Sequence, residues 1–279
     1  MIYFSHPASV RLQRRFWKRG SIQSWRKEIR VSEIERTPVI FINGLIGTLR
    51  DPEIHRQLGG RPSLAPDLLG YGALRNASVH EITINTQVER IREAIEEHFD
   101  KHPVHLVGHS VGGVVAYLFA QRYPERVVSI ISVEGNFTLK DAFWSSSVAQ
   151  MTQEEAEAML AGFQADPGAW LARSGIPDQP EKLSTARTWL ENQPASTLQA
   201  MAKSVVVITE KPDYHTALKE LFAAVPVYLL AGEHSVGDWD IPGWAKHEVV
   251  SLTIMPKAGH LMMLENPGAF GRIIAELLD

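Results

Sequence analysis

The chain has 279 residues, of which 44% are hydrophobic and 22% are charged, and its formal net charge at pH 7 is −4. This length favours one large domain with an insertion, and the apolar content excludes intrinsic disorder as the main state. A negative net charge provides no broad positive field for a polyphosphate backbone, so no nucleic-acid partner is expected. The sequence contains no cysteine, which excludes thiolate nucleophiles, disulfides and cysteine-ligated metals.

The sequence carries no signal for a membrane or for export. No stretch reaches the run of about 18 apolar residues that spans a bilayer. The N-terminal residues lack an apolar segment followed by a small-residue cleavage site. We therefore expect a cytoplasmic protein without membrane insertion. The basic residues between positions 11 and 30 are interpreted as a solvated charged face rather than as a contact with an acidic surface. Oligomeric state has no signal in the sequence.

Strand-like and helix-like segments alternate through the first half of the chain. Val39–Ile42 is a short apolar run that ends at Asn43-Gly44, which is typical of a buried strand followed by a turn. A shorter strand is predicted at residues 63–65. Residues 85–99 then carry apolar side chains at three- and four-residue spacing with charges between them, which predicts an amphipathic helix.

The next strand leads directly into a glycine-rich turn. Residues 104–107 are apolar and run into Gly108-His109-Ser110-Val111-Gly112, after which a helical pattern continues to Tyr123-Pro124. Val127–Val133 is nearly all apolar, as is typical of a strand covered on both faces. Alternation of this kind predicts an α/β fold with a mostly parallel central sheet flanked by helices.

The alternation stops after this strand, and helical patterns follow one another instead. They are predicted at residues 153–164, Pro167–Arg173, residues 181–191 and residues 196–206. Strand patterns resume at residues 225–231 and 249–255, and a last helix follows them. We therefore expect a core of residues 1–136 and 225–279, interrupted by a helical cap of residues 137–224.

Ser110 is the candidate nucleophile. The glycine-rich turn around it matches Gly-x-Ser-x-Gly, a pattern that is weak alone. Its place between an apolar strand and an amphipathic helix strengthens it, because a strained strand–turn–helix would lift the serine oxygen above the sheet edge. The flanking glycines would allow the backbones of strand and helix to approach each other.

A serine hydroxyl needs a base within hydrogen-bond reach, and an imidazole suits that task. His260 has the best position among the 11 histidines, because it follows the last predicted strand. Loops after the carboxyl ends of parallel strands converge on one edge of the sheet, where His260 can meet Ser110. His109, beside the serine, is expected to point away from it and to pack or hydrogen-bond locally.

Acyl transfer also requires donors for the developing oxyanion. The backbone N–H of Val111, at the start of the helix after the nucleophile, is one candidate. The second is the N–H of Leu45, in the turn after the first strand, where glycines on either side would let the backbone approach a ligand.

These segments together resemble the α/β-hydrolase fold superfamily, in which a helical cap is common among serine hydrolases. The resemblance extends over roughly residues 39–278. It depends on Asn43-Gly44 after a strand and on three longer segments, which are PDLLGYG at 66–72, GHSVGG at 108–113 and AGHLMMLENP at 258–267. It implies an oxyanion hole and a catalytic triad with Ser110 as nucleophile and His260 as base.

The acid of this implied triad is irregular. Members of the superfamily usually carry it about three residues after the glycine that ends the penultimate strand, but Ser235 stands there, after Gly232. Asp238, further along the same loop, is one candidate. The other is Glu134, which follows an apolar strand, as in certain haloalkane dehalogenases and lactonases of the superfamily. We favour Glu134, because a charge at such a position is costly to bury unless it is paired.

Candidate substrate-binding residues complete the expected site. Relatives usually carry His-Gly where this chain has Asn43-Gly44, so Asn43 supplies a different polar group there. His109, Trp144 and Trp170 are the other candidates. Large aromatic residues of the cap suit an acyl chain or an aromatic ring, although most of them are expected to hold the cap to the core. Metal-ligand spacings and arginine clusters are absent from the sequence, so no metal and no cofactor are expected.

The sequence therefore predicts a cofactor-independent serine hydrolase that cleaves an ester, lactone or thioester of a hydrophobic small molecule. Serine at position 110 does not suit the haloalkane dehalogenases and epoxide hydrolases of this fold, which use aspartate there. Two alternatives stay open. One is carbon–carbon bond hydrolysis or cofactor-free oxygenation, in which His260 acts mainly on the substrate. The other is a non-catalytic protein of the same fold that binds a small molecule.

Overall fold

The computed structural model describes residues 37–279. The expected core residues 1–36, including the basic segment at positions 11–30, lie outside the described residues. Within the described part, one six-stranded sheet has the order β2-β1-β3-β4-β5-β6, and every neighbouring pair of strands is parallel. The strands are β1 (Val39–Ile42), β2 (Ser63–Leu64), β3 (Val104–His109), β4 (Val127–Val133), β5 (Val227–Gly232) and β6 (Ser251–Met255). The predicted parallel sheet is confirmed.

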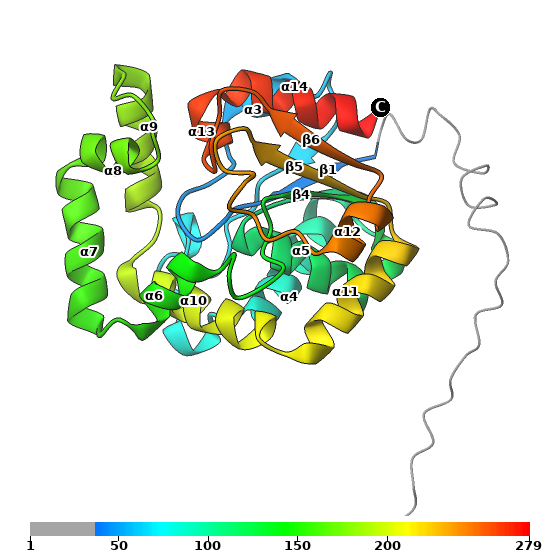
Figure 1. The fold of residues 1–279 in the computed structure, drawn as a ribbon, viewed down its shortest axis with the longest axis horizontal. Coiled ribbons are helices and arrows are strands. Elements are labelled where there is room, and N and C mark those ends of the chain that lie inside the picture. Colours follow the sequence, from blue (N-terminus) through cyan, green and yellow to red (C-terminus); the bar gives the residue numbers. More distant parts are fainter. Residues whose placement is uncertain (1–36) are drawn as a thin grey trace, which may run out of the picture. The chain divides into compact units, whose positions relative to one another are not determined.

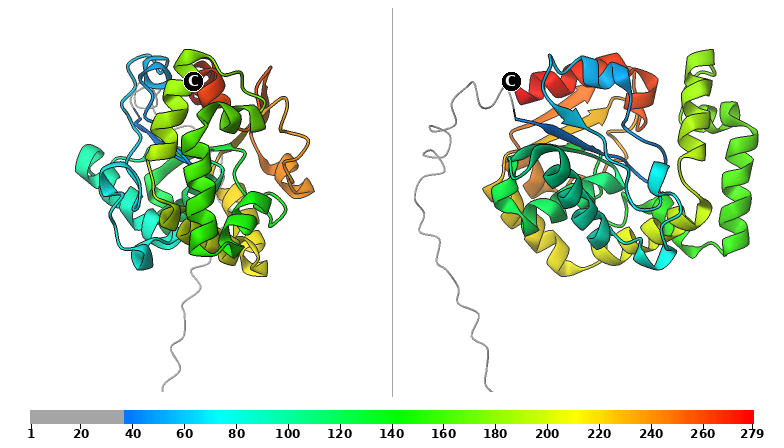
Figure 2. Two further views of the ribbon diagram at one scale, coloured as in Figure 1. Left: turned by 90° about the vertical axis from the view of Figure 1, so that its left-hand side faces the viewer. Right: turned by 180° about the vertical axis from the view of Figure 1, so that it is seen from behind.

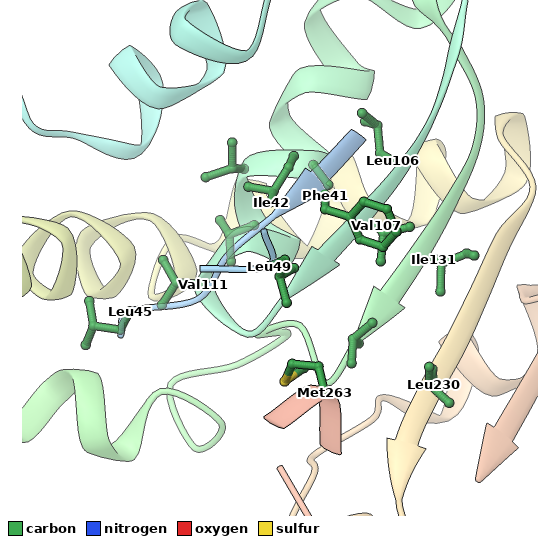
Figure 3. Packing of buried hydrophobic residues seen from close by; sticks show 14 of the residues in the cluster. Phe41, Ile42, Leu45, Leu49, Leu106, Val107, Val111, Ile131, Leu230 and Met263 are labelled. Carbon is green, nitrogen blue, oxygen red and sulfur yellow. The ribbon is translucent and has the colours of Figure 1, made fainter. Parts of the chain in front are cut away.

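The central strands are apolar because both faces of the sheet are covered. All residues of β1 and β3 are buried. The pairing aligns Phe41 with Val107 and Val107 with Ile131, so that apolar side chains of three strands form one layer. Figure 3 shows this layer, together with Leu230 of β5. Burial of these apolar side chains therefore stabilises the centre of the sheet. Because all strands are parallel, their carboxyl ends lie at one edge.

Helices cover the two faces of this sheet (Figures 1 and 2). One face carries α4 (Ile84–Phe99), α5 (Val111–Arg122) and α12 (Gly243–Glu248), and the other carries α3 (Pro52–Arg56), α13 (Met262–Glu265) and α14 (Pro267–Leu278). The helix predicted at residues 85–99 is confirmed, and a capping box between Thr83 and Thr86 defines its start. Short 3₁₀ turns are Gly72–Leu74, Val79–Glu81 and Pro124–Arg126.

A run of helices lies between β4 and β5, as predicted. Its members are α6 (Phe143–Gln150), α7 (Gln153–Ala165), α8 (Pro167–Arg173), α9 (Pro180–Glu191), α10 (Ala195–Thr209) and α11 (Pro212–Ala224). Figure 1 shows α7, α8 and α9 beyond the carboxyl ends of the strands. The sequence analysis predicted neither α6 nor α11 as separate helices. α6 contains three consecutive serines, which are weak helix formers, and it lacks a side-chain cap.

The boundaries of the cap stay a prediction. α11 lies inside the range assigned to it, yet its Phe222 packs against Tyr117 of α5, with ring centroids 5.6 Å apart. The strands β5 and β6 begin two residues later than predicted, because residues 225 and 249 cap the preceding helices. Between residues 37 and 279, no helix is long and apolar enough to cross a bilayer.

Candidate active site

Ser110 stands on the turn between β3 and α5. Its backbone has φ 52° and ψ −121°, a conformation that L-residues rarely adopt and that costs on the order of 1–3 kcal/mol. The turn is tight, because a methyl group on Gly108 would lie 2.5 Å from the carbonyl oxygen of Gly112. The Ser110 N–H donates to the carbonyl of Val133 at 2.9 Å, which ties the turn to the end of β4. The half-buried serine is thus presented at the carboxyl edge of the sheet.

His260 and Glu134 meet at the same edge. Nδ1 of His260 lies 2.6 Å from Oε2 of Glu134, although 126 residues separate them. The His260 side chain is 44% exposed, whereas that of Glu134 is 5% exposed. Glu134 follows β4, and like Ser110 it has a positive φ, of 45°. The structure therefore brings together the base and the favoured acid that the sequence analysis selected.

The second oxygen of Glu134 is also occupied. Oε1 accepts from the Gly232 N–H at 2.8 Å and from the Ser235 hydroxyl at 2.5 Å. Burial raises the pKa of Glu134, but its hydrogen bonds and the charge of His260 together lower that pKa below its ordinary value. The buried carboxylate is thus held in its charged form. Ser235 had no role in the sequence analysis beyond standing where an aspartate was expected.

Asp238, the alternative acid, lies elsewhere. Its side chain is exposed, and its N–H donates to the carbonyl of Ser235 at 3.0 Å. The hydrogen bond from His260 goes to Glu134 and not to Asp238. The loop after β5 turns at once, because the N–H groups of Ser235 and Val236 both donate to the Gly232 carbonyl, at 3.2 and 2.9 Å.

His109 was expected to point away from Ser110 and to pack or hydrogen-bond locally; it is buried, and its hydrogen bond is made to a residue distant in the sequence. Its Nε2 donates to the backbone carbonyl of His260 at 3.0 Å, and the two imidazole rings lie 4.6 Å apart. Burial, followed by the charge of His260, lowers the pKa of His109 to about 3, so this ring is neutral. Sequence spacing could not predict a contact between residues 151 positions apart. His109 supports the loop that carries His260, whereas its expected contact with substrate stays a prediction.

The turn after β1 lies against Ser110. A methyl group on Gly44 would be 3.2 Å from Cβ of Ser110. The Asn43 side chain is buried, and its Nδ2 donates to the carbonyl of Gly44 at 2.9 Å. Leu45 and Val111 are both buried, and Figure 3 shows them beyond the carboxyl end of β1. The two backbone segments predicted to hold the oxyanion donors are therefore close to Ser110.

Four tryptophans of the helical insertion and the loop after β5 differ in burial and in contacts. Trp170 is buried in α8, and Trp144 is half-buried in α6. Trp239 donates from Nε1 to the carbonyl of Gly135 at 2.9 Å, which is a structural contact. Trp189 of α9 packs directly on Gly47, in the turn after β1. No pattern in the sequence predicted this contact.

No group of three or more histidine, aspartate or glutamate side chains within residues 37–279 has the arrangement of a metal site.

A parallel sheet with an inserted helical segment, and a serine raised on a strained strand–helix turn, define the class of α/β hydrolases. A model of the alpha/beta hydrolase family matches residues 39–273. The chain belongs to the alpha/beta hydrolase family.

Individual proteins resemble the chain to different extents. It is 24% identical over 246 residues to the 2-succinyl-6-hydroxy-2,4-cyclohexadiene-1-carboxylate synthase of Enterobacter sp. (strain 638). The aligned region covers 86% of this chain and 91% of the synthase. It is 29% identical over 112 residues to Lipase 1 of Psychrobacter immobilis, covering 40% of this chain and 34% of the lipase. A thermophilic esterase from Thermogutta terrifontis has a similar structure, with a TM-score of 0.63, 20% identity and coverage of 87% and 89% of the two chains.

Proposed function

We propose that this protein is a cofactor-independent serine hydrolase that cleaves an ester, lactone or thioester of a hydrophobic small molecule. The observation that carries the proposal is the 2.6 Å contact between His260 and the buried Glu134, at the sheet edge where the turn presents Ser110. In the proposed triad, Ser110 is the nucleophile, His260 the general base and Glu134 the acid that orients His260.

The proposed reaction forms an acyl-enzyme. Oγ of Ser110 attacks the carbonyl carbon while Nε2 of His260 takes the hydroxyl proton. Collapse of the tetrahedral intermediate breaks the bond to the leaving group, which receives that proton from His260. A water molecule then repeats the attack on the acyl carbon, with His260 again as base, and releases the acid and Ser110.

Glu134 supports this cycle from a low-dielectric position. Its carboxylate accepts a hydrogen bond from the N–H at Nδ1, which leaves Nε2 as the basic nitrogen of His260, and its charge stabilises the imidazolium as it forms. Its lowered pKa keeps the carboxylate ionised at neutral pH. The N–H groups of Leu45 and Val111 are proposed to bind the oxyanion, in a site where such donors are worth far more than in water.

The surroundings of Ser110 favour an apolar acyl or aryl group. Leu45, Ile46 and Val111 are apolar and buried beside the turn. The Trp189 ring lies against Gly47 in the same turn. The partial match to a lipase and the fold shared with an esterase are consistent with ester-type substrates.

A fluorophosphonate probe tests the proposal directly. The wild-type protein should be labelled at Ser110, and short p-nitrophenyl esters should be hydrolysed. Folded wild-type protein that neither reacts with the probe nor turns over any ester, thioester or lactone would refute the proposal.

A second candidate is a reaction in which His260 acts on the substrate and Ser110 forms no acyl-enzyme, such as carbon–carbon bond cleavage. The match to a synthase along most of the chain favours keeping this candidate. Substitution separates the two. Ser110→Ala should abolish an esterase but leave appreciable turnover in the second case, whereas His260→Ala should abolish both.

A further inference from the structure

The helical insertion binds both backbone polar groups of Gly47. The Gly47 N–H donates to Oε1 of Gln193 at 3.1 Å, and Nδ2 of Asn192 donates to the Gly47 carbonyl at 2.9 Å. Both side chains belong to the short link between α9 and α10. Gln193 is fully buried and Asn192 is half-buried. The turn after β1 is therefore attached to the insertion by two hydrogen bonds across about 145 residues of sequence.

Trp189 strengthens the same attachment. Gly47 has φ +95°, and a methyl group there would lie 2.8 Å from Cγ of Trp189, with other ring atoms closer. Only glycine fits beneath this ring. Nε2 of Gln193 donates to the carbonyl of Trp189 at 3.1 Å, so the residue that accepts from Gly47 also binds the backbone of Trp189.

The link also holds the loop after β2. The Gly72 N–H donates to the Asn192 carbonyl at 2.8 Å, and the Thr197 hydroxyl donates to the Gly70 carbonyl at 3.2 Å. Between them stands Tyr71, which is fully buried. Its hydroxyl donates to the carbonyl of Leu45 at 3.0 Å. The insertion therefore also holds Gly70 and Gly72, which flank Tyr71, and the Tyr71 hydroxyl bonds to the turn after β1.

These contacts restrain the peptide that carries the Leu45 N–H. The carbonyls of Gly44, Leu45 and Gly47 are bound by Asn43, Tyr71 and Asn192 respectively. Rotation of the intervening peptides would break at least one of these hydrogen bonds. The insertion thus binds this turn directly at Gly47, two residues after Leu45, and acts on the Leu45 carbonyl through Tyr71.

We propose that Asn192 and Gln193 are positioning residues for oxyanion stabilisation, acting through Gly47 on the turn that carries the Leu45 N–H. This inference rests on the proposed function. The insertion then serves the chemical step as well as covering the substrate. A displacement of about 1 Å far from the chemistry can lower a rate by about 100-fold, so loss of this attachment affects kcat.

The test compares Asn192→Ala and Gln193→Leu with Gln164→Ala. Gln164 donates to the Leu190 carbonyl at 2.9 Å, so its hydrogen bond stays inside the insertion and does not involve the turn after β1. With a p-nitrophenyl ester, each of the first two variants should lose about 10- to 100-fold in kcat, with KM changed by less than about threefold. The inhibition constant of a trifluoromethyl ketone, which forms an oxyanion with the serine, should rise by the same factor. Gln164→Ala should change neither quantity.

Hydrogen exchange reports on the turn itself. Backbone amides of residues 43–49 should exchange faster in Asn192→Ala than in the wild type and in Gln164→Ala. Faster exchange confined to these residues would show that the variant is folded and that its turn is loosened. A raised KM with unchanged kcat would overturn the inference, as would an unchanged exchange rate in an active enzyme. Failure of the wild type to react with a fluorophosphonate would instead refute the proposed function.

Discussion

The Ser235 hydroxyl lies 2.5 Å from Oε1 of Glu134, while Oε2 of the same carboxylate lies 2.6 Å from Nδ1 of His260. Ser235 stands three residues after Gly232, where an acid is usual in proteins that this chain resembles. The usual position of the acid and the carboxylate of Glu134 are therefore adjacent in space. A carboxylate can reach His260 from β4 here because a small hydroxyl at position 235 leaves room and donates to it.

Replacement of Glu134 by glutamine should lower kcat for ester hydrolysis by about 1,000-fold or more, because an amide neither stabilises an imidazolium nor fixes the tautomer of His260. Asp238→Asn is the matched control, since Asp238 is exposed and does not bond to His260. Its kcat should stay within about twofold of the wild type, as is usual for a surface substitution. A loss in Asp238→Asn as large as in Glu134→Gln would contradict the assignment of the acid.

An aspartate introduced at position 235 should restore part of the activity that is lost when Glu134 is removed. Glu134→Ala removes the carboxylate, and adding Ser235→Asp supplies another beside the vacated volume. We expect the double variant to recover at least about tenfold in kcat over Glu134→Ala alone, because a carboxylate again faces Nδ1 of His260. Steady-state ester hydrolysis measures this difference. Equal rates in the single and double variants would show that position 235 cannot deliver a carboxylate to His260.

Gly47→Ala should destabilise the fold by about 3 kcal/mol or more, because a methyl group overlaps Trp189 and the residue must keep a positive φ. Gly59→Ala is its control. Gly59 also has a positive φ, of 62°, but no atom lies within 4 Å of an added Cβ, so backbone strain alone applies. That strain amounts to about 1–2 kcal/mol. Urea unfolding of both variants measures the difference, and equal losses would contradict the packing of Trp189 on Gly47.

His105 should make stability depend on pH. Burial, followed by the charge of Arg61, lowers the pKa of His105 from an ordinary value of 6.5 to about 4. In the unfolded chain this histidine gains a proton as the pH falls below about 6.5, whereas the folded protein gains it only near its lowered pKa. The contribution of His105 is therefore complete above pH 6.5 and is lost as the pH falls toward 4.

The variant His105→Asn tests this dependence. When the pH is lowered from about 7.5 to about 4.5, the free energy of unfolding should fall less in the variant than in the wild type. The two decreases should differ by on the order of 2 kcal/mol. Asparagine has no proton to gain in this range, although loss of the contact between Nδ1 and Ser129 lowers stability at every pH. Parallel curves of unfolding free energy against pH for the two proteins would contradict the prediction.

Much of the fold was predictable because it depends on local patterns. Val39–Ile42 and Val127–Val133 have the predicted bounds, since short, nearly all-apolar runs beside turn residues are typical of strands covered on both faces. A last helix follows the final strand as predicted, and it begins at Pro267, a residue type that suits the first helical position. α6 was not predicted, because its serine-rich sequence has no helical signal of its own and it forms against α10.

The sequence alone determined the class of fold and the candidate roles of Ser110 and His260, because turn chemistry and hydrophobic periodicity are local and strand order places both residues at one edge. Only the tertiary structure decided which carboxylate meets His260, and that His109, Trp189 and Gln193 support the loops around Ser110. These contacts join residues about 100 to 150 positions apart. They depend on how separate loops pack against one another, and no local pattern of residues encodes that packing.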